Sequence, residues 1–257
     1  MKKTFMLLMA MVMVVMMAAG CGGGEKKAAE APKVLRVGTE PTFAPFEFQK
    51  DGSKEFDGFD MDLIRAIGKQ LNMKVEILNM GFDALIPALN AGNIDVAAAG
   101  MSITPDRQKA VDMSDPYYVA GLVVVVNKDN TAVKGINELN NKAIAVQIGT
   151  TGAERAAKVP GAKVKNFNTN AEVFLELKNK GVEAVIIDKP VAEYFLATGG
   201  GKDYAKIVGD TMEAESYGLS LKKNSPLTKD INKALLDLKK NGEYDKIYAK
   251  WFGAVKK

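Results

Sequence analysis

The chain has 257 residues, of which 47% are hydrophobic and 26% are charged, enough for one large or two medium domains with a real core. Its net charge is +4, and its lysines are scattered with no basic stripe between aromatic residues, so we expect no nucleic-acid partner. It contains no histidine and one cysteine, which excludes a Ser-His-Asp triad, the usual zinc sites and an intrachain disulfide. We expect neither a metal nor a cofactor.

The first 20 residues have the pattern of a secretory signal peptide. Two lysines precede an apolar run over 5–19, which is shorter than the roughly 20 residues that a membrane-spanning helix needs. The sequence Ala-Ala-Gly-Cys at 18–21 resembles the cleavage site of bacterial lipoproteins, which would make Cys21 the lipidated N-terminus. An ordinary cleaved signal with a spare thiol is the alternative.

Residues 21–32 contain glycine, alanine and charged residues without apolar periodicity, so we interpret them as a flexible tether. A tether that follows a lipidated Cys21 predicts a protein anchored to the membrane outside the cytoplasm. The anchor would lie in the periplasm or on the cell surface.

The chain after the tether alternates between strand and helix patterns. Short apolar runs at 34–39, 75–78 and 94–98 indicate strands, with helical patterns between them. In the first helix, Asp60 is the expected N-cap of an apolar stripe. This alternation is typical of a parallel α/β sheet, whose ligands bind outside the carboxyl ends of the strands.

The stretch after the third strand has the features of a binding site for a small carboxylate. The strand gives way to Gly100 and Ser102. Thr104 and Pro105 then suit the N-cap and the first position of a short helix. Arg107 in that helix has a permanent planar charge, which matches a carboxylate with two parallel hydrogen bonds. A surface helix with a solvated arginine is the alternative.

The second half of the chain contains two β-rich runs, at 119–127 and 216–221, that we interpret as crossovers. Between them, a strand over 143–146 ends in the turn 147–152, which opens a helix. Gly-rich turns of this kind bind anions, although this one lacks the Gly-Lys-Ser/Thr of a P-loop. A further apolar strand ends at Asp188, for which a helix cap is the alternative to a binding role.

Five short motifs follow one another along the chain. They are Thr-Glu…Phe-Ala-Pro-Phe from 39 to 46, Gly-Phe-Asp-Met-Asp-Leu at 58–63, Phe-Asp-Ala-Leu-Ile-Pro at 82–87, Ile-Thr-Pro-Asp-Arg at 103–107, and Gly-Glu-Tyr…Trp-Phe from 242 to 252. In this order they resemble family 3 of the solute-binding proteins, the polar amino-acid-binding proteins of ABC transporters.

The resemblance covers about residues 33–252 and implies an α/β fold with two lobes, the type II periplasmic-binding-protein fold. Lobe 1 would comprise residues 33–118 and 217–253. Lobe 2 would comprise residues 119–216, and the two crossover strands would form the hinge.

The resemblance also assigns roles at the ligand head group. In this family the residue that matches Arg107 holds the ligand α-carboxylate, helped by the position of Ser102 beside Gly100. A backbone N–H near Thr151 adds a hydrogen bond to the same carboxylate. The residue that matches Asp188 holds the α-ammonium group, so that opposite lobes supply the two charges that a zwitterion needs.

The family places two aromatic residues, Phe43 and Phe82, against the ligand side chain, although Phe43 alone is equally an ordinary core residue. Glu40 ends the first strand and faces the same crevice. Glutamine-binding relatives resembling this chain carry a lysine where Gln147 stands, so Glu40 is expected to be a buried carboxylate without a partner.

A buried lone charge is costly, and a cationic ligand side chain removes that cost. The two phenylalanines would add cation–π attraction. The turn 147–152 also resembles that of arginine-binding members. We therefore expect arginine, lysine or another basic amino acid as the ligand. Glutamine comes next, because Glu40 and Gln147 could both bond an amide.

The resemblance implies a protein that is not an enzyme. It would deliver a free L-amino acid to the permease of an ABC importer by closing two lobes over it. We expect it to act as a monomer. Two alternatives stay open: a periplasmic dehydratase on the same scaffold, with Glu40 as proton donor, and a sensory ligand-binding module.

Overall fold

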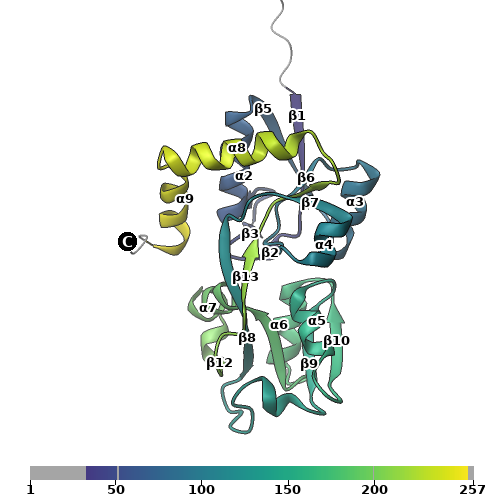
Figure 1. Cartoon of the computed structure of the whole chain (residues 1–257). Coiled ribbons are helices and arrows are strands. Elements are labelled where there is room, and N and C mark those ends of the chain that lie inside the picture. Colours follow the sequence, from purple (N-terminus) through teal and green to yellow (C-terminus); the bar gives the residue numbers. More distant parts are fainter. Residues whose placement is uncertain (1–32, 51, 199, 254–257) are drawn as a thin grey trace, which may run out of the picture. The chain divides into compact units, whose positions relative to one another are not determined.

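The computed structural model describes residues 33–50, 52–198 and 200–253 (Figure 1). These residues belong to one compact unit that begins at Lys33. The predicted signal peptide, Cys21 and the tether lie outside the described residues. Within the part of the chain that is described, no helix is both long and apolar enough to cross a bilayer.

The first lobe is built on a five-stranded sheet. Its order is β5 (Met73–Asn79), β1 (Lys33–Thr39), β6 (Val96–Ala97), β14 (Ser220–Lys222) and β7 (Val111–Met113). Strand β1 is parallel to β5 and β6, whereas β14 is antiparallel to β6 and β7. A small sheet consists of β2 (Thr42–Phe43), β3 (Glu47–Gln49) and β4 (Phe56–Asp57). The helices are α2 (Phe59–Gln70), η2 (Phe82–Ala84), α3 (Leu85–Ala91), α4 (Pro105–Ala110), α8 (Leu227–Lys240) and α9 (Glu243–Phe252).

The second lobe is built on a second large sheet. Its order is β10 (Lys163–Phe167), β9 (Ala143–Gln147), β11 (Ala184–Asp188), β8 (Tyr118–Asn127) and β12 (Ala205–Val208), and β13 (Ala214–Tyr217) pairs with β8 off this path. Strands β9, β10 and β11 are parallel, whereas β8 is antiparallel to its neighbours. The helices are η3 (Ile136–Leu139), α5 (Thr151–Ala157), α6 (Asn170–Lys178), α7 (Lys189–Thr198) and η4 (Gly201–Asp203).

Strands β8 and β13 connect the two sheets and run side by side (Figure 1). The first part of β8 pairs with β13, from Tyr118 opposite Tyr217 to Gly121 opposite Ala214. The second part of β8 pairs with β11 and β12 in the second sheet. After β13 the chain enters β14 in the first sheet, so the predicted return run at 216–221 contributes to two strands. The predicted two-lobed α/β fold with two crossover strands is confirmed.

Helix α2 illustrates how a sequence pattern produces packing. Its residues Leu63, Ile64 and Ile67 recur at helical spacing, and all three side chains are fully buried. Helix α2 packs against β5, α8 and α9. The predicted apolar stripe is therefore the face by which this helix joins the core of the first lobe.

The predicted N-cap of α2 is wrong. The N-cap is Gly58, whose φ of 129° is a conformation that L side chains rarely adopt, and no side chain caps this helix. Asp60 therefore lies inside the first turn and points into the core. Its Oδ2 accepts hydrogen bonds from the Gly100 N–H (2.9 Å) and the Tyr117 hydroxyl (2.6 Å).

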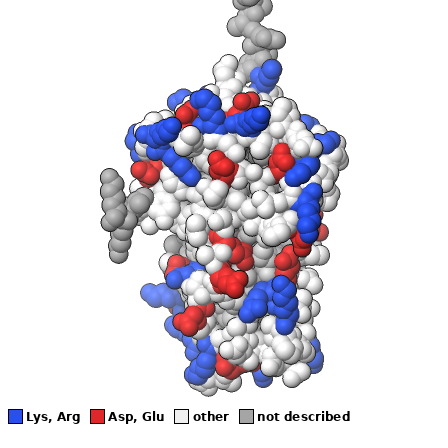
Figure 2. Space-filling view, viewed as in Figure 1, with Lys and Arg blue, Asp and Glu red and all other residues white. Residues whose placement is uncertain are grey.

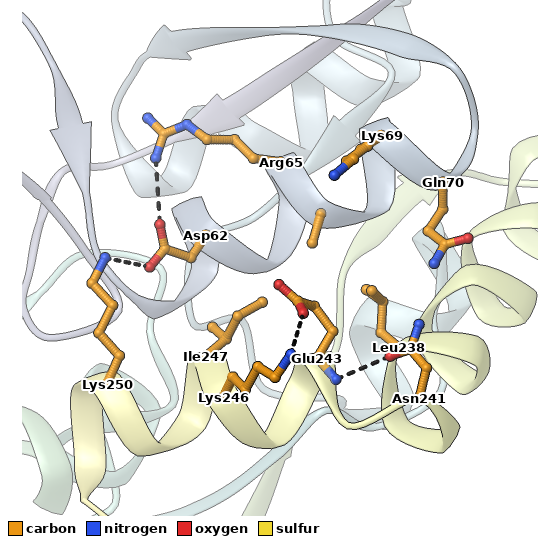
Figure 3. A pocket seen from close by; sticks show the side chains of 11 residues that line it. Asp62, Arg65, Lys69, Gln70, Leu238, Asn241, Glu243, Lys246, Ile247 and Lys250 are labelled. Atoms are coloured by element: carbon orange, nitrogen blue, oxygen red, sulfur yellow. Dashed lines mark hydrogen bonds and ion pairs between the residues drawn. The ribbon is translucent and has the colours of Figure 1, made fainter.

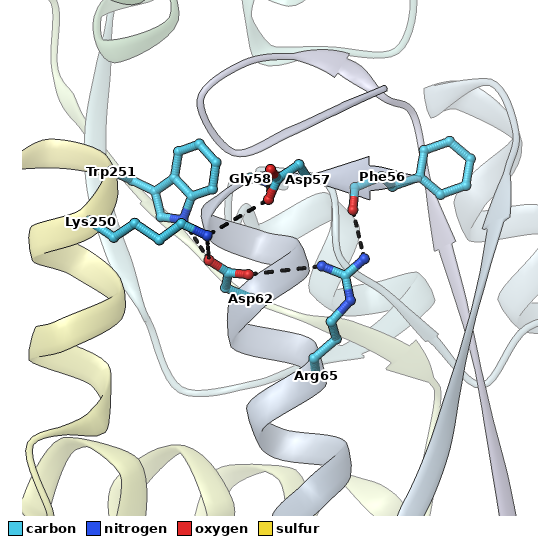
Figure 4. A network of polar contacts seen from close by, with 7 residues as sticks. All are labelled: Phe56, Asp57, Gly58, Asp62, Arg65, Lys250 and Trp251. Atoms are coloured by element: carbon cyan, nitrogen blue, oxygen red, sulfur yellow. Dashed lines mark hydrogen bonds and ion pairs between the residues drawn. The ribbon is translucent and has the colours of Figure 1, made fainter. Parts of the chain in front are cut away.

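Helix α9 packs against the first lobe through its aromatic residues. Tyr248 and Phe252 lie against Phe59 of α2, with ring centroids 6.2 and 5.3 Å apart. The Trp251 indole N–H donates to the Asp62 carboxylate at 2.8 Å (Figure 4). These contacts fix helix α9 on the first lobe.

Acidic and basic side chains are interspersed on the face seen in Figure 2. No continuous basic stripe crosses that face. The scatter of lysines in the sequence is thus also a scatter over this side of the molecule.

We predict that Leu63→Ala destabilises the fold by about 2–5 kcal/mol, because it leaves a cavity in a fully buried site. The matched control is Leu236→Ala in helix α8, whose side chain is 48% exposed and whose loss should cost about 0.5 kcal/mol or less. Urea unfolding measures both. Similar losses in the two variants would contradict the packing of α2.

Candidate ligand-binding site

A pocket lies where strands of both sheets end. The space at the pocket, counted together with the open solvent at its mouth, is about 310 Å³. All nine predicted ligand-binding residues line it: Glu40, Phe43, Phe82, Gly100, Ser102, Arg107, Gln147, Thr151 and Asp188. The lining also includes three residues that the sequence analysis did not select: Glu47, Ala99 and Thr150.

The topology explains why residues so distant in sequence meet. Glu40 directly follows β1, while Gln147 and Asp188 are the last residues of β9 and β11. The carboxyl ends of parallel strands meet at one edge of each sheet, and the two edges face the same pocket. Local order along the strands therefore places the polar side chains of both lobes together.

Arg107 is held by the short helix α4. Thr104 caps this helix by accepting the Arg107 N–H at 3.2 Å, and Pro105 occupies its start, as predicted. The Arg107 side chain is 8% exposed, and its guanidinium donates to the carbonyls of Ser102 (2.8 Å) and Gly149 (2.9 Å). The second of these bonds joins the two lobes.

The Arg107 guanidinium also lies over the Phe82 ring, with its central carbon 5.3 Å from the ring centroid. Burial lowers the pKa of this guanidinium, yet a guanidinium remains protonated in proteins. A fixed positive charge with five donors, of which the two carbonyls engage only part, therefore borders the pocket. The predicted alternative of a solvated surface arginine does not fit this burial.

Asp188 supplies the opposite charge from the second lobe. Its side chain is 8% exposed, and the Tyr217 hydroxyl donates to Oδ1 at 2.6 Å. Burial raises the pKa of Asp188 to about 7. No lysine or arginine of the described residues forms an ion pair with it. Asp188 is thus a buried acid that a cation in the pocket would stabilise in its charged form.

Glu40 corrects one expectation, because it is not without partners. Its carboxylate accepts hydrogen bonds from the Thr42 hydroxyl (2.7 Å) and from the Gln147 side-chain amide (2.8 Å). Asn170 donates to the other end of that amide at 2.8 Å and so fixes its orientation. All these donors are neutral, and burial raises the pKa of Glu40. What Glu40 lacks is a countercharge.

The comparisons with known proteins give the chain its family. The model of the bacterial extracellular solute-binding proteins, family 3, matches residues 35–254. The chain belongs to this family.

Among family 3 relatives, a probable histidine-binding protein of Neisseria gonorrhoeae is 34% identical over 88% of this chain and 85% of the relative. The arginine-binding extracellular protein ArtP of Bacillus subtilis is 33% identical over 87% of this chain and 88% of the relative.

Solved structures agree with this assignment. An ancestral arginine-binding protein bound to arginine has a TM-score of 0.83 and 47% identity, over 87% of this chain and all of that one. The ancestral arginine-binding protein bound to glutamine has a TM-score of 0.80 and 46% identity over the same shares. An ancestral amino acid-binding protein, a precursor of cyclohexadienyl dehydratase, has a TM-score of 0.78 and 40% identity, over 85% of this chain and 95% of that one.

Glu47 is a pocket residue of this family 3 chain that the sequence analysis missed. It lies on β3, is 1% exposed, and its Oε2 has no hydrogen-bond partner among the described residues. Burial raises the pKa of Glu47 well above its ordinary value, and the nearby carboxyls of Asp60, Glu40 and Asp188 add to the shift. The only sign of this residue in the sequence is an acid between Phe46 and Phe48. Only tertiary packing shows whether its side chain faces the pocket or the solvent.

Glu215 was also missed. It lies on the crossover strand β13 and accepts hydrogen bonds from the hydroxyls of Ser102 (2.6 Å) and Thr151 (2.7 Å). Helix α5 begins at Thr151, two residues earlier than predicted, because the Thr150 hydroxyl caps it by accepting the Ala153 N–H at 3.1 Å. The start of this helix therefore reaches the pocket.

A second hollow lies between helix α2 and helices α8 and α9 (Figure 3). Four of its charged side chains form two pairs: Lys246 with Glu243 at 3.4 Å, and Lys250 with Asp62 at 2.7 Å (Figures 3 and 4). Partly exposed pairs of this kind are ordinary surface interactions. The hollow shares no lining residue with the pocket at the strand ends, and we assign it no role in ligand binding.

We predict that Asp60 makes the protein less stable as the pH rises from 5 to 7.5. Burial raises the pKa of Asp60 from 3.8 to about 7, so in this window the folded chain holds a proton that the unfolded chain has already lost, and unfolding becomes more favourable as the pH rises toward 7. Asp60→Asn should reduce the loss by about 2–3 kcal/mol, measured by urea unfolding at both pH values. The exposed Asp210→Asn is the control, and an unchanged pH dependence in Asp60→Asn would contradict the assignment.

Proposed function

We propose that this protein binds a free L-amino acid with a basic side chain and delivers it to the permease of an ABC importer. The observation that carries the proposal is the placement of two buried, opposite charges, Arg107 and Asp188, on one pocket from two lobes. A zwitterionic amino-acid head group satisfies both charges at once. Neutral or singly charged solutes would leave one of them buried and uncompensated, which is costly.

The head group would lie between α4 and the end of β11. The α-carboxylate would accept hydrogen bonds from the guanidinium of Arg107 and from backbone N–H groups near Gly100 and at the start of α5. The α-ammonium would donate to Asp188, whose other partner is the Tyr217 hydroxyl.

The ligand side chain would extend toward Glu40. A bound cationic group would keep Asp188 and Glu40 ionised, whereas burial raises the pKa of Glu47 and favours its neutral form. Together with the Arg107 guanidinium, the pocket of the complex would then carry a net charge of −1. An amino acid with a basic side chain carries +1, so the sum is zero. Phe43 and Phe82 border the same pocket and would flank the cationic group.

The relatives support this ligand class, since their names record binding of histidine and arginine. Glutamine is the second candidate. The ancestral arginine-binding protein also has a glutamine-bound structure, and the paired Glu40 and Gln147 side chains offer an acceptor and a donor to an amide.

Binding would close the two lobes about β8 and β13. Arg107 of the first lobe already contacts the Gly149 carbonyl of the second, and Gln147 contacts Glu40 across the same boundary. A ligand that bonds groups of both lobes favours the arrangement in which they are close. The closed form would then be the shape that a permease recognises.

The protein would act outside the cytoplasm as a monomer attached to the membrane. The family consists of extracellular solute-binding proteins. The sequence before Lys33 carries a signal pattern that ends at Cys21, which would take the lipid anchor. Mass spectrometry of the mature N-terminus tests this part of the proposal.

A dehydratase is the alternative that the ancestral neighbour raises. It would use Glu40 as a proton donor, or Glu47, whose Oε2 has no hydrogen-bond partner among the described residues. Asp188 argues against it, because a cyclic diene acid without an ammonium group would leave this carboxyl buried without a cation. Measurable turnover of prephenate or arogenate would favour the enzyme.

The direct test of the proposal is a thermal-shift screen of the twenty amino acids. A ligand at 100 times its Kd stabilises a protein by roughly 2.7 kcal/mol. Arginine and lysine should give the largest shifts and glutamine a smaller one. A screen without any shift would contradict the proposed function.

We predict that Arg107→Ala weakens arginine binding by roughly 2–5 kcal/mol, because it leaves the ligand carboxylate buried without its countercharge. Calorimetric titration measures the loss. Arg155→Ala, which removes an exposed arginine of α5, is the matched control and should bind as the unaltered protein does. Weakening of less than about tenfold in Arg107→Ala would contradict the assigned role.

We predict that Glu40→Gln weakens arginine binding by about tenfold or more while changing glutamine binding less, because only the cationic side chain needs the charge of Glu40. Titrations of both ligands into the same variant measure the ratio. The exposed Glu76→Gln serves as the control. Equal losses for arginine and glutamine would refute the charge argument.

A further inference from the structure

Glu215 makes a contact that the proposed binding mechanism does not use. Its Oε2 accepts hydrogen bonds from the Ser102 hydroxyl at 2.6 Å and from the Thr151 hydroxyl at 2.7 Å. Ser102 follows β6 in the first lobe, and Thr151 opens α5 in the second. One carboxylate oxygen therefore touches both lobes.

The strand that carries Glu215 is part of the crossover itself. In β13, Glu215 lies opposite Ala120 of β8. The neighbouring Ser216 carbonyl accepts the Ile103 N–H at 2.7 Å, and Ser102 forms a bridge with Tyr217. The backbone thus attaches this part of β13 to the first lobe, so the bond from Thr151 is the one that spans the boundary.

Glu215 lies outside the pocket that would hold the ligand, because it is absent from the lining. Glu215 instead lines a separate hollow, whose other lining residues include Thr104, Glu154 and Arg155. A bound amino acid would therefore not touch it. Its charge also acts on the neighbouring charges of Arg107 and Asp188. An effect of Glu215 on affinity therefore acts through the arrangement of the lobes or through these two head-group charges, and only the first changes the shape of the ligand-free protein.

The two hydroxyls have a further consequence for the ligand. A hydroxyl has one hydrogen to donate, and those of Ser102 and Thr151 point to Glu215. They are then not available to a ligand carboxylate. This changes the expected role of Ser102, whose hydroxyl would hold the lobes together with that of Thr151. Arg107 and backbone N–H groups, including the one expected near Thr151, would still bind the ligand carboxylate.

We propose that Glu215 is an interlobe clasp, a positioning residue whose carboxylate binds the hydroxyls of Ser102 and Thr151 and so stabilises the closed arrangement before a ligand enters. The effect of the clasp on ligand affinity rests on the proposed function, whereas its effect on the shape of the ligand-free protein does not. A protein that is closed for a larger fraction of the time pays less to bind, so the clasp raises affinity for every ligand by the same factor.

The test compares Glu215→Ala with Glu213→Ala. Glu213 lies two residues earlier, is exposed, and has no side-chain hydrogen bond among the described residues. Glu213→Ala therefore removes one negative charge, as Glu215→Ala does, but leaves the clasp in place. Small-angle X-ray scattering of the ligand-free full chain should give a larger radius of gyration for Glu215→Ala only. Excess arginine should restore equal values.

Calorimetric titration with arginine, lysine and glutamine gives the second readout. Charge-assisted hydrogen bonds of this kind predict a loss of about tenfold to a hundredfold for Glu215→Ala, equal for all ligands. Ser102→Ala added to Glu215→Ala should cost little more, because its partner is already gone. If Glu215→Ala folds poorly, Glu215→Gln with the same Ser102→Ala cycle replaces it.

Three results would overturn the clasp. Tighter binding by Glu215→Ala would mean that Glu215 competes with the ligand. Unequal losses among the three ligands would mean that it touches them. An unchanged radius of gyration with unchanged affinity would mean that it holds nothing. If the unaltered protein binds no amino acid at all, the proposed function fails, while scattering of the ligand-free variants still decides the clasp.

Discussion

Arg107 and Asp188 are each only 8% exposed, yet neither forms an ion pair with another described residue. Removing a charge from water is costly unless an opposite charge replaces the lost solvation. Neutral partners meet part of that cost, namely two carbonyls for the guanidinium and one tyrosine hydroxyl for the carboxyl. Each group therefore still lacks a countercharge, a negative one at Arg107 and a positive one at Asp188, and both groups border one pocket. The rest of the site follows from this arrangement.

A few structural elements place these charged groups around the pocket. Parallel strands deliver Glu40, Gln147 and Asp188 at their carboxyl ends, and one capped turn of helix presents Arg107. Two crossover strands keep the halves close, and hydrogen bonds from Arg107 to Gly149 and from Gln147 to Glu40 cross the boundary between them. A small zwitterion bound at that boundary would contribute contacts to both lobes. Recognition and closure would then be the same event.

The sequence predicted those parts of the site that depend on local order. The Thr104-Pro105 start of a helix and the polar residues after apolar strands are set by neighbouring residues, and the structure brings all nine predicted residues to one pocket. It did not predict features that depend on tertiary packing. Asp60 suited a cap but faces the core, because Gly58 turns the chain first. Glu47 and Glu215 occupy unremarkable strand positions, and only the folded chain shows what surrounds them.

A crystal structure of the protein with arginine tests the central claim most directly. It should show the ligand carboxylate on the Arg107 guanidinium, the α-ammonium on Asp188, and the side-chain guanidinium directed at Glu40 between the two phenylalanines. Arginine bound elsewhere, or bound with Arg107 and Asp188 both turned away from its head group, would contradict the account.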